Sequence, residues 1–227
     1  MKTNLCIIPA RGGSKRIPHK NIKHFLGKPI IAYSIETAIK SMLFDEIMVS
    51  TDDAAISQIA LQYGAKVPFF RRTETSNDFA TLSDVITEAS QFYLNNNLDF
   101  ANICCILPTA PFATVENLKK GLEMLEKYDD ADYVRPLVRF SFPIQRALRL
   151  KMNKSELFYP EFINTRSQDL EPAFHDSGQF YWMRFKNGLN GTNLYGFEIP
   201  ESLAQDIDTE EDWKIAEQKY KLASLDI

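Results

Sequence analysis

Short apolar runs alternate along this sequence with longer segments in which apolar residues recur every three or four positions. The runs at residues 5–9, 46–51, 67–70 and 102–107 predict strands, and the first is apolar on both faces, as is typical of a buried parallel strand. The intervening segments predict helices from the sets Ile31/Ile35/Ala38/Ile39/Met42, Ile56/Ile59/Ala60/Tyr63, Leu82/Val85/Ile86/Ala89/Tyr93 and Val115/Leu118/Leu122/Leu125. This alternation predicts an α/β fold with a mostly parallel sheet, helices on both faces and right-handed crossovers.

Several element boundaries have local signals. Pro29 suits the first turn of a helix, and Asp52 or Asp53 can cap the next one. Gly64 fits the end of that helix. A closing helix is expected to begin near Thr209, whose hydroxyl would form a capping box with Asp212.

The regular alternation breaks after about Phe140. Residues 147–152 and 156–159 flank Asn153-Lys154, which predicts a hairpin turn. We interpret residues 140–170 as an element inserted outside the main sheet. The parallel pattern is expected to resume with strands at residues 179–183 and 195–199, so the 227 residues are predicted to form a single domain, 1–227, with this insertion.

The composition is ordinary for a soluble globular protein, with 44% hydrophobic and 25% charged residues. No apolar run approaches the ~20 residues needed to span a bilayer, and the run at residues 5–10 is too short for a signal peptide. The three cysteines, Cys6, Cys104 and Cys105, lie in predicted strands without a CxxC pair. We therefore expect a cytoplasmic protein with buried thiols and no membrane association.

Charge is distributed unevenly. The formal net charge of −4 argues against nonspecific nucleic-acid binding, so no nucleic-acid partner is expected. Residues 11–28, however, contain six Lys or Arg and no Asp or Glu. Part of this stretch is a glycine-rich loop, residues 10–16, directly after the first predicted strand. Ligands of doubly wound sheets bind beyond the carboxyl ends of strands, and backbone N–H groups of such loops cradle phosphates.

The loop therefore predicts a phosphate site in which Gly12 and Gly13 allow close approach and Arg11, Lys15 and Lys20 supply charge. It matches neither GxxxxGK[ST] nor GxGxxG. A solvated basic loop is the alternative interpretation.

A second motif is Asp206-Ile207-Asp208-Thr209 near the end of the chain. Two carboxylates in a loop can approach one hard cation, and Mg²⁺ prefers oxygen ligands. The alternative is a polar helix entrance in which Asp208 or Thr209 is only a cap.

Residues 8–21, Ile-Pro-Ala-Arg-Gly-Gly-Ser-Lys-Arg-Ile-Pro-His-Lys-Asn, resemble the signature of the CMP-sugar-acid synthetases. This family activates sialic, pseudaminic, legionaminic and keto-deoxy-octonic acids. Gly27-Lys28-Pro29 and the ending Asp-Ile-Asp-Thr-x-x-Asp are also similar to the family, and the resemblance covers nearly the whole chain. Gly13, Arg16 and the runs at residues 141–148 and 173–182 resemble the pseudaminic acid branch.

The resemblance implies a Rossmann-like three-layer nucleotidyltransferase fold and an Mg²⁺-dependent transfer of CMP from CTP to an acidic nine-carbon sugar. It implies nucleotide binding by Ala10, Arg11, Gly12, Gly13, Ser14, Lys15, Lys20, Asn21, Thr81 and Pro108, sugar binding by Gln145, Arg166, Gln179 and Tyr181, metal binding by Asp206 and Asp208, and catalytic roles for Arg11, Lys20 and Asp208. It also implies a homodimer in which the inserted hairpin of one subunit completes the sugar site of its partner.

One departure concerns the base. Many sialic acid enzymes carry a Gln that recognises cytosine where this chain has Leu107, so recognition here must come from backbone or another side chain. His175 beside Asp176 is not favoured as a general base, since adjacent side chains in an extended run point apart.

Three alternatives stay open at this stage. In the first, the acceptor is sialic, legionaminic or keto-deoxy-octonic acid instead of pseudaminic acid. In the second, the enzyme uses a different nucleotide or a sugar phosphate. In the third, the protein is a non-catalytic regulator that binds CTP without releasing pyrophosphate.

Overall fold

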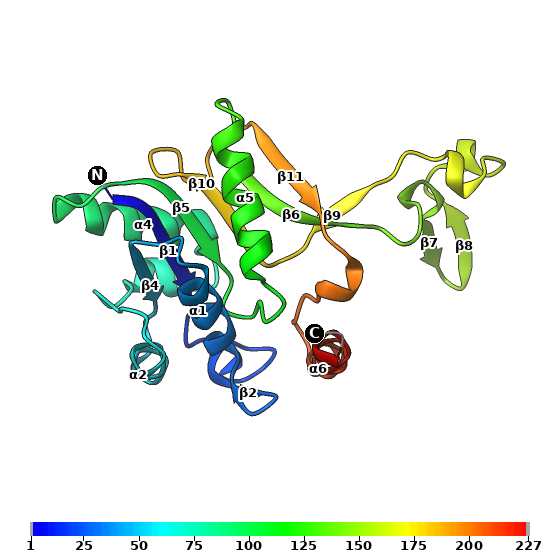
Figure 1. Cartoon of the computed structure of the whole chain (residues 1–227). Helices are drawn as coiled ribbons and strands as arrows, with labels where there is room; N and C mark the ends of the chain where they lie inside the picture. Colours follow the sequence, from blue (N-terminus) through cyan, green and yellow to red (C-terminus); the bar gives the residue numbers. More distant parts are fainter. Residues whose placement is uncertain (1, 226–227) are drawn as a thin grey trace.

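A seven-stranded sheet forms the centre of the molecule in the computed structural model, which describes residues 2–225 (Figure 1). The strand order is β11-β6-β10-β5-β1-β4, and β9 pairs with β6. The strands are β1 (Lys2–Pro9), β4 (Glu46–Ser50), β5 (Phe100–Ile106), β6 (Tyr133–Arg139), β9 (Phe174–Asp176), β10 (Phe180–Arg184) and β11 (Leu194–Glu198). The α/β fold predicted from the strand–helix alternation is confirmed.

Helices cover both faces of this sheet. They are α1 (Ile30–Ser41), α2 (Ala54–Gln62), the short α3 (Thr73–Ser76), α4 (Leu82–Asn95), α5 (Val115–Lys127) and α6 (Glu210–Leu225). Along β1, Cys6 and Ile8 point to the core shared with α1, α2 and α5, whereas Leu5 and Ile7 point to the core shared with α4. Both faces of β1 are buried, so apolar residues occupy successive positions and form the continuous run seen in the sequence.

The predicted caps are formed by local hydrogen bonds. Of the two candidates before α2, Asp53 is the cap, since its Oδ1 accepts from the amides of Ala55 (2.8 Å) and Ile56 (3.0 Å). Gly64 follows α2 with a φ of +92°. The Thr209 amide donates to Asp212 Oδ2 (2.8 Å), and the Asp212 amide donates back to Thr209 Oγ1 (3.2 Å), which is the expected capping box before α6.

The strand direction after the insertion was predicted wrongly. β10 runs antiparallel to both β5 and β6, and only β11 is parallel to β6. The chain leaves the body at the carboxyl end of β6 and returns to the same edge, so β10 has to start there and run in the opposite direction. β6 was not predicted, because its alternating half-buried pattern contains no continuous apolar run.

Three smaller predictions also need correction. Residues 67–70 form no strand and contribute only an isolated bridge between Thr51 and Phe70. Ile39 and Met42 are 42% and 89% exposed, because α1 buries its opposite side and Met42 ends the helix in a left-handed conformation. The turn of the hairpin is formed by Met152 and Asn153, which both have positive φ. It therefore lies one residue earlier than expected.

A third apolar cluster connects the basic stretch to the C-terminal helix. It contains Ile17, Phe25, Ile30, Tyr33, Phe112, Ile207, Trp213 and Ala216. The basic stretch of the chain contains the short elements η1 (Lys20–Ile22), β2 (His24–Phe25) and β3 (Lys28–Pro29). The short helix η5 (Glu201–Leu203) precedes the acidic pair.

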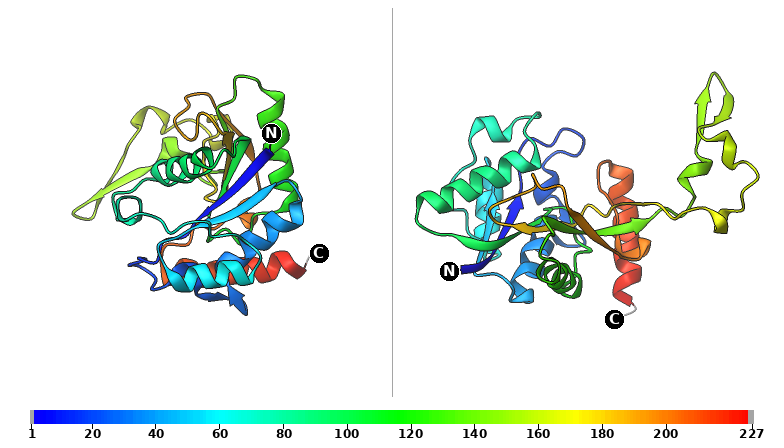
Figure 2. Two further views of the ribbon diagram at one scale, coloured as in Figure 1. Left: turned by 90° about the vertical axis from the view of Figure 1, so that its left-hand side faces the viewer. Right: turned by 90° about the horizontal axis from the view of Figure 1, so that it is seen from above.

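The inserted residues form an arm that stands away from the body (Figures 1 and 2). It contains the antiparallel hairpin of β7 (Leu148–Lys151) and β8 (Lys154–Leu157), together with η2 (Ile144–Arg146), η3 (Pro160–Phe162) and η4 (Ser167–Asp169). The predicted hairpin is therefore present. Its predicted role in dimerisation stays a prediction.

No helix within residues 2–225 has the length and apolarity required for crossing a membrane. Cys6, Cys104 and Cys105 are buried free thiols, as expected.

Candidate active site

A cleft of about 560 Å³ opens at the edge of the sheet where β1, β4 and β5 end. It is lined by Pro9, Arg11, Ser14, Lys15, Arg16, Lys20, Asn21, Arg71, Thr75, Asn77, Ala80, Thr81, Leu82, Val85, Leu107, Pro108, Thr109, Asp206 and Asp208. The structure thus brings the basic loop, the start of α4, the end of β5 and the acidic pair to one place.

The glycine-rich loop is held by the neighbouring strand and helix. The Ala10 amide donates to Ser50 O (2.9 Å), and the Gly12 amide donates to Asp52 Oδ1 (2.9 Å). A Cβ added at Gly12 would lie 2.7 Å from Asp53 Oδ2, so only glycine permits this close approach. Ala10 and Gly12 therefore shape the loop, Gly13 does not line the cleft, and the predicted nucleotide-binding residues that line the cleft are Arg11, Ser14, Lys15, Lys20, Asn21, Thr81 and Pro108.

Arg11 and Lys15 face a carboxylate on the opposite wall of the cleft. Arg11 donates from Nη1 to Asp78 Oδ1 (3.1 Å) and to Asn77 O (3.0 Å), and Lys15 donates to Asp78 Oδ2. The ammonium of Lys15, followed by the guanidinium of Arg11, lowers the pKa of Asp78 below its usual value. These groups are exposed, so a more highly charged anion such as a polyphosphate can replace Asp78 at small cost.

Arg16 and Lys20 reach the acidic pair near the end of the chain. Arg16 binds Asp208 through both terminal nitrogens at 2.8 Å. Lys20 Nζ lies 2.7 Å from Ile207 O and 3.4 Å from Asp208 Oδ1. The basic loop and the acidic pair therefore share one cleft.

The acidic pair suits a divalent cation that also contacts phosphate. Asp206 and Asp208 both line the cleft, and within residues 2–225 Asp206 makes no ion pair. The described residues contain no group of three or more His, Cys, Asp or Glu placed to hold a metal. Because Mg²⁺ is usually bound by one or two carboxylates plus substrate phosphates, two carboxylates beside a phosphate site fit this ion.

Arg71 was not predicted as a site residue. It is only 7% exposed, lines the cleft and donates through Nε to Ser50 Oγ (3.0 Å) and through Nη2 to Ser50 O. Burial lowers the pKa of this guanidinium, yet an arginine stays charged at neutral pH. In the sequence it stands beside Arg72, and nothing local distinguishes the buried arginine from the exposed one.

The wall formed by α4 and the end of β5 is partly polar. The Thr81 hydroxyl donates to Asp84 Oδ2 (2.7 Å) and accepts from the Asp84 amide (3.2 Å), so Thr81 caps α4 and lines the cleft at once. Leu107 lies in this wall and offers no side-chain hydrogen bond to a base.

The predicted sugar-binding residues lie in two separate places. Gln179 is 2% exposed and donates from Nε2 to Leu203 O (2.6 Å), while its buried Oε1 has no hydrogen-bond partner in residues 2–225. Tyr181 hydrogen-bonds to Asp176, and burial is the main cause that raises its pKa. His175 Nδ1 lies 2.8 Å from Asp176 O, and its ring packs on Phe140.

Gln145 and Arg166 belong to the arm. Gln145 Nε2 donates to Glu171 O (2.9 Å), and the Arg166 side chain is 78% exposed with Asp169 3.9 Å away. Figure 1 shows the arm standing away from the body of the molecule, and neither residue lines the cleft. Within one chain the structure does not bring these two residues to the cleft.

A mostly parallel α/β sheet with a cationic glycine-rich loop and facing carboxylates at its carboxyl edge suits the transfer of a nucleotidyl group. A family model described as cytidylyltransferase matches residues 5–170. The chain belongs to the cytidylyltransferase family, which confirms the resemblance and the kind of enzyme that the sequence predicted.

Relatives agree with this assignment, and a solved structure agrees with the fold. A pseudaminic acid cytidylyltransferase of Campylobacter jejuni (strain 81-176) is 42% identical over 96% of this chain and 97% of its own length. A CMP-N,N'-diacetyllegionaminic acid synthase of Legionella pneumophila is 31% identical over 96% of each chain. A solved CMP:2-keto-3-deoxy-manno-octonic acid synthetase complexed with CTP has a TM-score of 0.71 at 18% identity, covers 99% of this chain and 100% of its own, and shows the fold alone.

The two loop glycines allow a matched test. We predict that Gly12→Ala raises the Kd for CTP between about ten- and a hundred-fold, because its Cβ collides with Asp53 and displaces the loop. Gly13→Ala should change the Kd by less than about two-fold, since no described atom lies within 4 Å of its added Cβ. Calorimetric titration measures both, and equal effects of the two substitutions would contradict the proposed loop geometry.

Proposed function

We propose that this protein transfers CMP from CTP to the anomeric hydroxyl of pseudaminic acid and releases pyrophosphate. The observation that carries the chemistry is the single cleft shared by the basic loop and the pair Asp206 and Asp208. Similarity to pseudaminic acid cytidylyltransferases over almost the whole chain supports the choice of sugar. The three buried free thiols support a reducing cytoplasm as the site of this reaction.

Charge neutralisation is the main task of the loop. In the reaction the sugar oxygen forms a bond to the α-phosphorus of CTP while the bond to the departing pyrophosphate breaks. Arg11, Lys15, Arg16 and Lys20 line the cleft in which the phosphates would lie, and buried Arg71 adds a fifth cation. Fixed charges of this kind stabilise the transferring phosphoryl group without a covalent intermediate.

Asp206 and Asp208 would hold the Mg²⁺ ion. When bound there, Mg²⁺ supplies Lewis-acid stabilisation of charge on the α-phosphate. Asp208 also forms ion pairs with Arg16 and Lys20. The same carboxylate therefore links the basic loop to the proposed metal position.

The sugar site is proposed to need a second subunit. Gln179 offers a buried amide oxygen without a partner in the described chain, on the segment that precedes β10. Arg166, suited to bidentate binding of a carboxylate, lies on the arm. The arm exposes the large apolar side chains of Phe142, Leu148, Leu150, Met152 and Ile163. Such a surface favours burial against another chain, so we propose a homodimer in which Arg166 of the partner subunit reaches the sugar carboxylate.

A substrate panel tests the reaction. With CTP and Mg²⁺, we expect pyrophosphate release with pseudaminic acid to exceed that with sialic, legionaminic or keto-deoxy-octonic acid, and mass spectrometry should detect the CMP-sugar. Preference for another acid would change the proposed acceptor. Pyrophosphate release with another nucleotide but not with CTP would reject CTP as the substrate. Binding of CTP without release of pyrophosphate would indicate a non-catalytic regulator.

Asp208→Ala tests the proposed metal position. We predict a loss of about a hundred-fold or more in kcat, together with inactivation of the wild-type enzyme by EDTA and recovery with Mg²⁺. Glu210→Ala is the control, because Glu210 is a nearby carboxylate whose partner is Lys23 and which does not line the cleft. Near-normal turnover of Asp208→Ala would reject the assignment.

Subunit mixing tests the shared sugar site. Arg166→Ala and Asp208→Ala homodimers are each expected to be inactive, but a heterodimer would contain one site with both residues. After random exchange, about one quarter of wild-type activity should return. Failure to regain activity despite heterodimer formation by mass spectrometry, or an active monomer, would contradict the proposed arrangement.

A further inference from the structure

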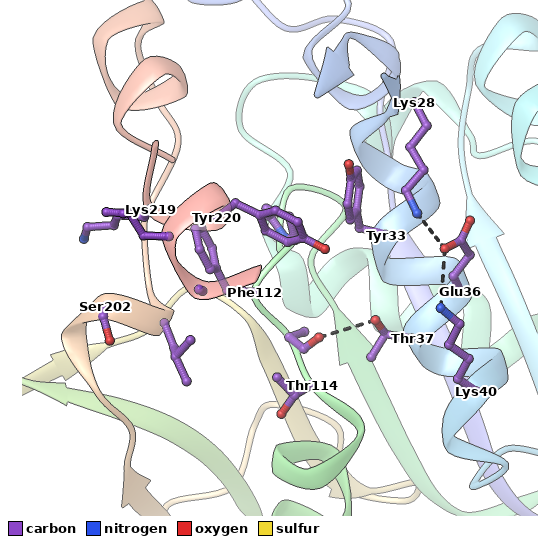
Figure 3. A pocket seen from close by; sticks show the side chains of 15 residues that line it. Lys28, Tyr33, Glu36, Thr37, Lys40, Phe112, Thr114, Ser202, Lys219 and Tyr220 are labelled. Carbon is purple, nitrogen blue, oxygen red and sulfur yellow. Dashed lines mark hydrogen bonds and ion pairs between the residues drawn. The ribbon is translucent and has the colours of Figure 1, made fainter. Parts of the chain in front are cut away.

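A second cavity of about 540 Å³ lies between α1, α6, η5 and the segment that joins β5 to α5 (Figure 3). None of the described residues that line it also lines the catalytic cleft. A molecule bound here would therefore not occupy the space proposed for the nucleotide.

Aromatic side chains form much of its wall. Tyr33 and Tyr220 meet edge-to-face with centroids 5.3 Å apart, and Phe112 lies 5.7 Å from Tyr220. In Figure 3 the rings of Tyr33 and Tyr220 come from facing helices and approach each other across the cavity. Burial raises the pKa of Tyr33 to about 12, so this phenol is uncharged at neutral pH. The wall can contact an apolar ring without adding negative charge.

Cations outnumber acids around this aromatic wall. Lys28 Nζ lies 2.6 Å from Glu36 Oε2, and Lys40 Nζ approaches the same oxygen at 3.9 Å. Figure 3 shows Glu36 between these two lysines on the α1 side. Lys219 on α6 donates to the carbonyls of Glu201 (3.3 Å) and Ala204 (3.0 Å), and it forms no ion pair with a carboxylate of residues 2–225. Three lysines and one glutamate line the cavity, so its electrostatics favour an anion.

We propose that this cavity is a second ligand site, separate from the catalytic cleft, for an organic anion that carries an apolar ring. The ring lies against Tyr33, Phe112 and Tyr220, and the anionic group lies near Lys28 and Lys40. The volume of about 540 Å³ is in the range of small-molecule sites.

Two walls of this site continue into the catalytic cleft. Phe112 follows Pro108 and Thr109 by a few residues, and Leu203 precedes Asp206 by three. Leu203 O also accepts the hydrogen bond from Gln179. The position places a bound anion directly behind the segments that carry the proposed nucleotide and metal contacts.

Anilinonaphthalene sulfonate is a suitable probe, because it combines aromatic rings with one anionic group. Its fluorescence should rise to saturation as the probe fills one site, and CTP should not displace the probe from that site. Lys40→Glu should raise the Kd of that site about five- to ten-fold, since the charge beside the sulfonate reverses. Ala223→Phe, which places a ring in the lining, should abolish the site.

Two controls match these variants. Lys221→Glu makes the same charge reversal on α6 outside the lining, and Ala55→Phe adds a ring on exposed α2; both should bind the probe as the wild type does. Circular dichroism and turnover with CTP show that each variant is folded. Wild-type binding by both Lys40→Glu and Ala223→Phe would place the probe elsewhere, such as on the apolar arm, and overturn the proposal. Displacement by CTP, or loss of binding as the protein self-associates, would overturn it as well.

Discussion

Burial of Ile17 and Phe25 against Ile207 and Trp213 joins the two ends of the active site. Ile17 follows the basic loop, and Ile207 separates the two aspartates of the acidic pair. Each is almost completely buried, and burial of such a side chain stabilises the fold by about 1.5–3 kcal/mol. The charged neighbours project from this apolar contact into the cleft. The electrostatic site therefore depends on a hydrophobic contact between segments at opposite ends of the chain.

The cations of the cleft outnumber its carboxylates. Asp78 pairs with Arg11 and Lys15, and Asp208 pairs with Arg16 and Lys20. Because these pairs are partly exposed, each contributes little to stability and can be exchanged for a stronger interaction with phosphate. These pairs position the four cations at the cleft.

The arm and the second cavity both lie outside the catalytic cleft. The arm begins and ends at the edge of the sheet beside the cleft, and its outgoing and returning strands, β6 and β9, pair antiparallel. It thereby carries exposed apolar surface and Arg166 beyond the body of its own chain. The second cavity borders the third apolar cluster, since Tyr33 and Phe112 belong to the cluster and also line the cavity.

The sequence by itself determined the α/β class, most of the strands and helices, the cap at Thr209, an aspartate cap before α2, and the cationic glycine-rich loop. These features depend on periodicity and on hydrogen bonds between residues a few positions apart, so they are visible in a short stretch of sequence. The acidic pair was visible as a motif, and the family resemblance favoured metal binding over helix capping as its role, which stays a prediction. Only the tertiary structure decided the direction of β10, the exposure of Ile39 and Met42, the burial of Arg71 and the pairing of Asp78 with the loop. Each of these depends on contacts between segments distant in the sequence, where local patterns do not specify the partner or the direction of approach.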